Sequence, residues 1–94
     1  MSERTAPALA VLDSLLPALS TLPVSPPRDQ LVEETEALRR AVAAFHMEAI
    51  RFRMHAVDRL MRQVGDPAEC RDLLEQVRRA LEAGGFHTGS HTAP

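Results

Sequence analysis

Methionine and histidine side chains recur at regular spacing in the middle of the chain, as they would in a soft-metal site. Met47, Met54 and Met61 repeat every seven residues, and His46 and His55 flank two of them. Thioether and imidazole groups are ligands that suit copper(I). Seven residues of helix, however, span about 10.5 Å, which is too far for two side chains to bind one ion. We therefore interpret the methionines as an adaptable packing stripe and expect no metal or cofactor.

The sequence lacks the motifs of common bundle enzymes. It contains no Glu-x-x-His, no His-Glu-x-x-His and no second cysteine to pair with Cys70. Cys70 falls on the apolar face of a predicted helix, where we expect it to be buried as a small apolar side chain. His87 and His91 are four residues apart, but their Gly-, Ser- and Thr-rich surroundings would not hold helical geometry. We predict no catalytic residues and no enzymatic activity.

Arg39, His46 and Arg53 form a narrow polar seam between two apolar stripes of a predicted helix. A buried arginine requires an acidic partner. The seam is therefore either a pocket for an anionic ligand or a partner carboxylate, or the site of an ion pair between two subunits. The acidic residues available for such a pair are Glu33, Glu34 and Glu36. A small-ligand or metal sensor at His46 and Arg53 is one alternative function.

The sequence contains arginines and no lysine, and several of the arginines fall in the same predicted helix. They are Arg40, Arg51, Arg53, Arg59 and Arg62. An Arg-rich, dimeric, nucleic-acid-associated regulator is therefore a second alternative. Glu48 and Asp58 interrupt this face, and the formal net charge of −2 provides no overall attraction to nucleic acid or to an anionic membrane. The pattern favours a solvated face.

The elements that must position these residues are helices, starting with an apolar, proline-punctuated leader over residues 1–24. Its leucines fall at three- and four-residue spacing, which is typical of one helix face. They are Leu9, Leu12, Leu16 and Leu19. Pro17 should kink or end this helix. We predict a short helix over about residues 7–16, with a brief resumption after Pro17 as the alternative.

A long helix is predicted to follow the leader. Ser25 precedes two prolines, which is a typical helix start, and acidic residues come next, near the helix N-terminus. No glycine or proline then occurs before Gly65. We predict one continuous helix over about residues 26–64, roughly 58 Å long.

A second, shorter helix completes the predicted hairpin domain over residues 25–84. Asp66 and Pro67 give its start signal, and two glycines after Ala83 give its end, so we expect it over about residues 67–83. The remaining residues, 85–94, are predicted to form a flexible tail.

The long helix would carry more apolar surface than the short one covers. One stripe contains Leu31, Leu38, Val42, Phe45, Ala49, Phe52, Ala56 and Leu60. The other contains Val32, Ala43, Met47, Ile50, Met54, Val57, Met61 and Val64. A helix packed against one neighbour needs an apolar arc of only about 100°. The uncovered part predicts an interaction surface made of Val42, Phe45, Met47, Ile50, Phe52, Met54, Val57 and Met61.

We therefore expect an all-α fold: a helical hairpin with one long central helix and a short N-terminal helix, completed as a four-helix-type bundle by an antiparallel homodimer. The antiparallel arrangement would place the acidic residues 29–36 of each copy beside the Arg-rich residues 39–62 of the other.

The expected function is a non-catalytic helical protein–protein interaction module, such as an adaptor, a chaperone-like protein or a regulatory subunit. Its partner would be a second copy of the chain, another helical protein, or both. The single cysteine, together with the lack of a long apolar run and of a clear signal peptide, predicts a cytoplasmic protein without membrane insertion.

Overall fold

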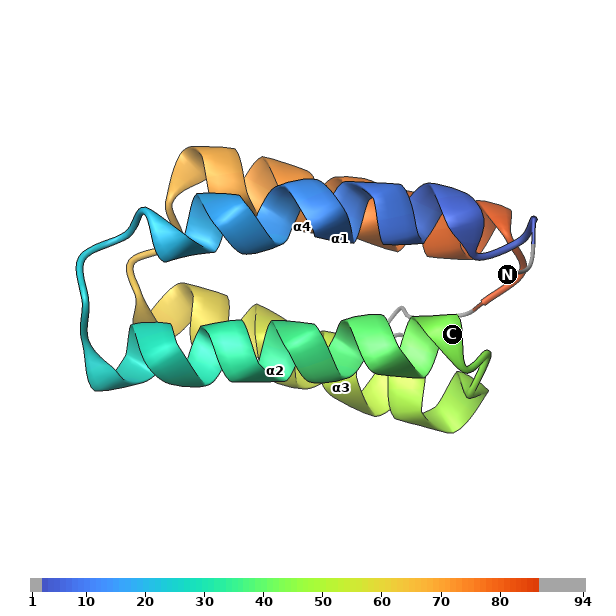
Figure 1. The fold of residues 1–94 in the computed structure, drawn as a ribbon, viewed down its shortest axis with the longest axis horizontal. Coiled ribbons are helices and arrows are strands. Elements are labelled where there is room, and N and C mark those ends of the chain that lie inside the picture. The colour runs from blue at the N-terminus through green and yellow to red at the C-terminus, as the bar shows by residue number, and fades with distance from the viewer. Residues whose placement is uncertain (1–2, 87–94) are drawn as a thin grey trace, which may run out of the picture.

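Four helices make up most of the chain in the computed structural model, which describes residues 3–86. They are α1 (Ala6–Ser20), α2 (Pro26–Ala43), α3 (Met47–Gln63) and α4 (Ala68–Ala83). Successive helices run in opposite directions and lie side by side, so one chain forms an up-down-up-down bundle (Figure 1). The described residues contain helices and no strand, which confirms the all-α prediction.

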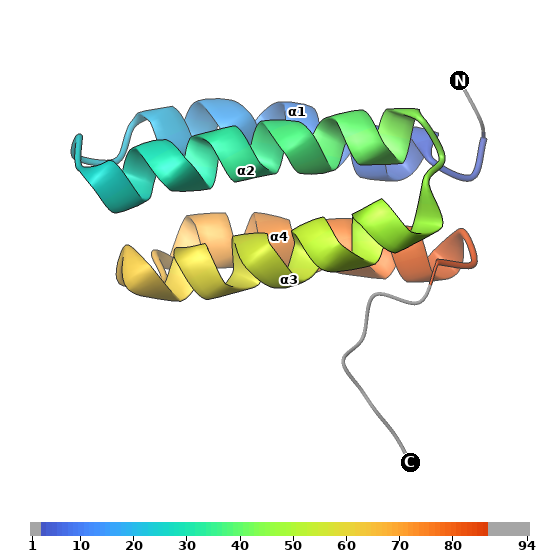
Figure 2. The same cartoon turned by 90° about the horizontal axis from the view of Figure 1, so that it is seen from below.

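The bundle consists of two layers of two helices. α1 lies along α4 in one layer, and α2 lies along α3 in the other (Figures 1 and 2). The layers meet through α1 and α2 on one side and through α3 and α4 on the other. The α3–α4 contact is by far the less extensive of the two.

The leucines of α1 lie in the centre of the bundle. Leu9, Leu12, Leu15 and Leu19 are buried and belong to one apolar cluster with residues from the other three helices. Burying a leucine is worth about 1.5–3 kcal/mol, so this segment contributes a large part of the core. The predicted leader therefore supplies the cover that the short fourth helix could not provide.

The prediction of one continuous helix over residues 26–64 is wrong. The chain ends α2 at Ala43, turns through residues 44–46 and starts α3 at Met47. With the two halves folded against each other, most residues of both apolar stripes contribute to a core that α1 and α4 complete. Covering the apolar residues therefore no longer requires a second copy of the chain. The homodimer remains a prediction, but the need to bury apolar surface no longer supports it.

The turn between α2 and α3 uses a phenylalanine where a glycine is usual. Phe45 has a φ of 61°, and the N–H of His46 donates to the carbonyl of Ala41 at 3.1 Å. The ends of α3 and α4 have the same six-residue hydrogen bond, with Gly65 and Gly85 in the left-handed position. Because no glycine marks the first turn, no local pattern predicted it.

α1 is longer than predicted because it continues through Pro17. Proline removes one N–H from the helix and crowds the carbonyl four residues earlier, here that of Asp13. Both residues are exposed, whereas Leu15 and Leu19 on either side of the proline are buried. Core packing on both sides of Pro17 therefore outweighs the local preference to stop.

The fourth helix corresponds closely to the expected one, but the residues after it do not. Phe86 lies within the predicted flexible tail 85–94, yet only 1% of it is exposed and it belongs to the core. The rest of that tail, residues 87–94, lies outside the described residues.

Candidate protein-binding surface

The predicted interaction surface divides into a buried part and an exposed part. Five of its eight residues lie in the core, namely Val42, Ile50, Met54, Val57 and Met61. The other three remain accessible: Phe52 is 66% exposed, Met47 48% and Phe45 42%. The accessible part of the surface therefore centres on α3 and the turn before it.

Phe52 lies on the side of α3 that faces away from the bundle. The buried residues of this helix are Ile50, Met54, Ala56, Val57, Leu60 and Met61. At about 100° per residue, Phe52 lies roughly opposite Ile50, Met54, Val57 and Met61 and closer to Ala56 and Leu60. The guanidinium carbon of Arg53 lies 5.4 Å from the ring centroid of Phe52 and covers part of it. The rest of the ring is open to a partner.

Phe45 is only partly available, because the chain itself holds one side of it. Its ring meets the ring of Phe86 edge to face, with centroids 5.1 Å apart and planes at 78°. The guanidinium carbon of Arg4 lies 5.1 Å and 5.3 Å from the two ring centroids, and its Nε donates to the carbonyl of Gly84 at 2.7 Å. This cluster joins both ends of the described chain to the α2–α3 turn.

The predicted polar seam does not form one site, because its three residues have separate roles. Arg39 reaches α1, where its Nε donates to Asp13 at 2.7 Å; this hydrogen bond lowers the pKa of Asp13. Arg53 donates to Glu34 of α2 at 2.8 Å. The Nδ1 atom of His46 accepts from the N–H of Ala49 at 3.2 Å and caps α3.

The pairing of Arg53 with Glu34 joins an acidic residue of the first half to a basic residue of the second, as expected, but within one chain. α2 and α3 run antiparallel, which is the arrangement that we predicted for two subunits. A groove of about 450 Å³ between them has acidic and basic walls, with Glu33 and Glu36 near Arg40 and Arg59. Mixed charge of this kind gives no preference for an anionic ligand.

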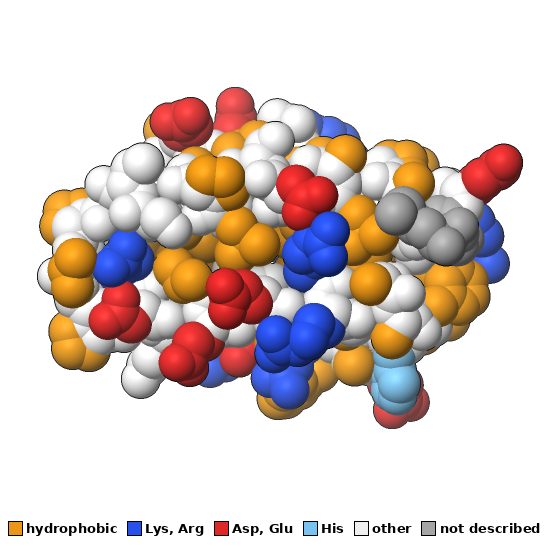
Figure 3. All heavy atoms as spheres, viewed as in Figure 1, with side chains coloured by type: hydrophobic (Ala, Val, Ile, Leu, Met, Phe, Trp, Pro, Cys, Tyr) orange, Lys and Arg blue, Asp and Glu red, His pale blue; other side chains and the backbone are white. Residues whose placement is uncertain are grey.

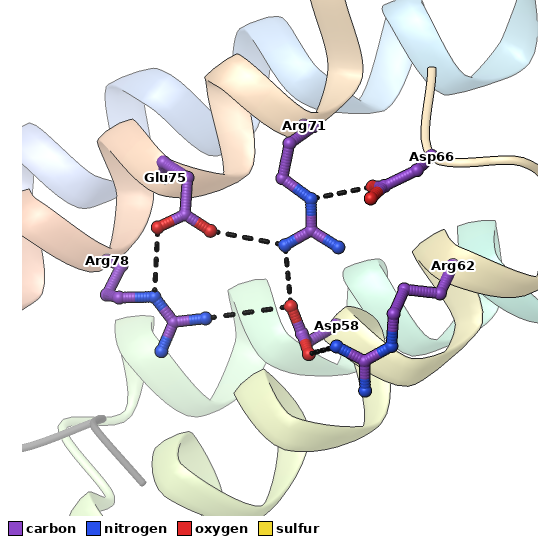
Figure 4. A network of polar contacts seen from close by, with 6 residues as sticks. All are labelled: Asp58, Arg62, Asp66, Arg71, Glu75 and Arg78. Atoms are coloured by element: carbon purple, nitrogen blue, oxygen red, sulfur yellow. Dashed lines mark hydrogen bonds and ion pairs between the residues drawn. The ribbon is translucent and has the colours of Figure 1, made fainter. Parts of the chain in front are cut away.

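An ion-pair network between α3 and α4 was not predicted. It consists of Asp58, Arg62, Asp66, Arg71, Glu75 and Arg78 (Figure 4). Arg71 reaches Asp58 at 2.5 Å, Asp66 at 2.6 Å and Glu75 at 3.1 Å. The network bridges α3 and α4, which have the least extensive contact of the neighbouring helix pairs.

Burial and charge act in opposite directions on this network. Desolvation alone would raise the pKa of Asp58, but the hydrogen bond from Arg71 and the charges of Arg71, Arg62 and Arg78 outweigh it and lower that pKa. Pairs within one helix, such as Arg71 with Glu75, are visible in the sequence as four-residue spacings. The pair between helices depends on how α4 lies against α3.

Cys70 lies in the core, as the sequence predicts. Burial, with a smaller effect of Glu69, raises the pKa of its thiol. A nucleophilic cysteine requires the opposite shift, towards the thiolate. Cys70 therefore acts as an apolar core residue in this structure.

Charged groups on the surface over α1 and α2 alternate in sign. Figure 3 shows acidic and basic side chains beside each other on this face, separated by small apolar areas. Surfaces that bind nucleic acid usually carry an extended basic stripe. No such stripe is seen on this side of residues 3–86 (Figure 3).

Comparisons with known proteins found no matching family model, no matching curated protein and no matching solved structure. Within residues 3–86, no helix combines the length and apolarity that crossing a membrane requires. The same residues contain no group of three His, Cys, Asp or Glu side chains placed to share a metal ion.

Proposed function

We propose that this chain is a non-catalytic helical protein–protein interaction module whose binding surface is the outer side of α3. The observation that carries the proposal is the exposure of Phe52, one of three aromatic residues in the chain, at 66%. Burying such a ring against a partner is worth about 1.5–3 kcal/mol. Aromatic residues of this kind often provide much of the binding energy of a protein interface.

The position of Phe52 supports this reading over that of an incidental surface residue. Arg51, His55 and Arg59 are exposed within two turns of it and offer polar contacts around the apolar ring. Val24 is even more accessible, at 78%, but lies in the connection between α1 and α2 and has a smaller side chain. Val24 is therefore a suitable control.

The chemistry of the remaining groups also supports a binding role. The arginines of the former polar seam are engaged with Asp13 and Glu34, and Cys70 is held away from its thiolate form. These residues stabilise helix contacts in this structure. They do not converge on a common point where a substrate would react.

Site-specific photo-crosslinking tests the proposal. A benzoylphenylalanine replaces Phe52 in one full-length variant and Val24 in another, and each is irradiated in an extract of the native host. We expect a discrete protein adduct from position 52 and not from position 24. The identified protein, a second copy of this chain included, should then bind the purified chain about tenfold or more weakly after Phe52→Ser, which corresponds to roughly 1.4 kcal/mol.

Two results would contradict the proposal. One is the absence of any protein adduct from position 52, and the other is the same set of adducts from both positions. Adducts with nucleic acid, together with binding that weakens steeply with salt, would support the nucleic-acid alternative instead.

A further inference from the structure

The outer side of α3 carries a row of residues with the spacing of a helix–helix contact. Glu48, Phe52, His55 and Arg59 are separated by four, three and four residues, and all are exposed. Alternation of threes and fours keeps residues on one side of a helix and is the spacing of coiled-coil seams. We call these four residues the α3 seam. It lies opposite the core-facing Met54 and Val57.

The charges of the α3 seam are arranged symmetrically about its centre. Glu48 lies four residues before Phe52, and Arg59 lies four residues after His55. A twofold axis between Phe52 and His55 would therefore place each glutamate opposite an arginine. The same axis would place each phenylalanine ring opposite an imidazole.

On the basis of the proposed binding role of α3, we propose that its partner is a second copy of this chain, paired antiparallel through the α3 seam. Glu48 then faces the partner's Arg59 twice in each dimer, on either side of the axis. Phe52 packs against the partner's His55 in the middle. The two Phe52 rings supply the apolar contact in the middle, and the two ion pairs fix orientation and register.

Charge excludes the parallel alternative. Two α3 helices running in the same direction would set Glu48 against the partner's Glu48, and Arg59 against the partner's Arg59. Like charges facing each other in an interface are unfavourable. The order of charges along the α3 seam therefore selects the antiparallel pair.

The proposed contact differs from the dimer that the sequence predicted. In that dimer, buried residues such as Ile50 and Met54 would have joined the two copies, whereas here each copy keeps its closed core. α3 has 17 residues, so the contact extends over about 25 Å at most. A contact between single helices of this length belongs to the small, reversible class of interfaces. We expect a monomer–dimer equilibrium that depends on concentration.

Sedimentation equilibrium on charge-exchanged variants tests the pairing. Glu48→Arg places two arginines opposite each other, and Arg59→Glu places two glutamates opposite each other. Each single variant should weaken dimerisation about tenfold or more. The double variant E48R/R59E restores opposite charges only in the antiparallel pair, and it should dimerise within about threefold of the original chain.

A mixture of the two single variants also tests the charge pairing between positions 48 and 59. An equimolar mixture of E48R and R59E contains complementary seams and should form a mixed dimer that neither variant forms alone. Arg79→Glu and Glu82→Arg, two exposed positions on α4, make the same charge changes away from the seam. They should leave dimerisation unchanged, and circular dichroism should show all variants equally folded.

Several results would overturn this inference. They are a chain that stays monomeric over the accessible concentration range, a dimer that the single exchanges do not weaken, and a double variant as weak as the singles. If position 52 crosslinks to a different protein while the chain stays monomeric, the inference fails and the proposed function stands. If position 52 gives no protein adduct, the proposed function fails as well.

Discussion

Phe45 and Phe86 meet edge to face with ring centroids 5.1 Å apart, and this contact closes one end of the bundle. It joins the turn between α2 and α3 to Phe86, which comes three residues after the end of α4. Arg4 covers both rings, at 5.1 Å and 5.3 Å, so the segment before α1 takes part too. Three segments far apart in the sequence are held together here without a regular element.

Removing the ring of Phe86 should be strongly destabilising. This side chain is 1% exposed, and Phe→Ala in a core costs about 3–5 kcal/mol because a cavity remains. Urea unfolding of Phe86→Ala, followed by circular dichroism, measures the loss. Phe52→Ala is the matched control and should change the free energy of unfolding by less than about 0.5 kcal/mol. Equal effects at the two positions would show that Phe86 is not part of the core.

Phe45 should respond to glycine and alanine in different ways. With a φ of 61°, alanine keeps the left-handed strain and loses the ring contact, whereas glycine loses the contact but relieves the strain. We expect Phe45→Gly to be more stable than Phe45→Ala by about 1 kcal/mol. At Ala43, the last residue of α2, alanine should instead be preferred over glycine. Thermal unfolding of the original chain, Phe45→Gly, Phe45→Ala and Ala43→Gly compares glycine with alanine at both positions. A more stable alanine variant at position 45 would contradict the left-handed turn.

Asp58 should contribute stability at neutral pH that is lost in acid. Its pKa is lowered in the folded chain, so its contribution is fully present above the ordinary value of 3.8 and disappears as pH falls through the lower folded value. Asp58→Asn should cost about 1.5–3 kcal/mol at pH 7, the range for hydrogen bonds to charged groups. The difference from the original chain should shrink below about pH 3.8 and in high salt. Urea unfolding at several pH values measures it.

Asp72 provides the control for this experiment, because it is exposed on the same helix as Arg71. Asp72→Asn makes the same chemical change outside the network and should have an effect of less than about 0.5 kcal/mol. A pH-independent difference for Asp58→Asn would mean that shape rather than charge accounts for its effect.

Replacing Pro17 should stabilise the protein. Pro17→Ala restores the N–H that can donate to the carbonyl of Asp13 in a helix that is already continuous, and proline inside a helix costs up to about 3 kcal/mol. Pro7→Ala, in the first turn of the same helix, replaces a proline that costs little there and should be near neutral. Differential scanning calorimetry compares the two. A lower melting temperature for Pro17→Ala would argue that α1 depends on the proline.

Local signals in the sequence located several helix ends correctly. Ser25 accepts from the N–H of Arg28 at 3.2 Å and starts α2, and Gly65 ends the turn after α3, as their types suggest. A glycine also follows α4 where one was expected. These predictions succeeded because capping and left-handed turns depend on a few adjacent residues.

Local residue types did not predict the break at Phe45 or the continuity of α1 through Pro17. In both places the local preference opposes the observed structure, and long-range packing outweighs it. Phe45 adopts a costly φ because Phe86 and Arg4 hold its ring, and Pro17 is tolerated because Leu15 and Leu19 are buried on either side. Contacts so distant in the sequence have no fixed spacing that a pattern could reveal.

The candidate binding surface also depends partly on local sequence pattern and partly on long-range packing. The sequence placed Phe52, Met54 and Met61 together in the predicted interaction surface, but the structure buries both methionines and leaves the phenylalanine in solvent. The sequence by itself determined an all-helical chain, its apolar stripes and most of its helix ends, because periodicity and capping are local. The tertiary structure decided which residues of each stripe are buried and which a partner can reach, because burial depends on the packing of all four helices at once.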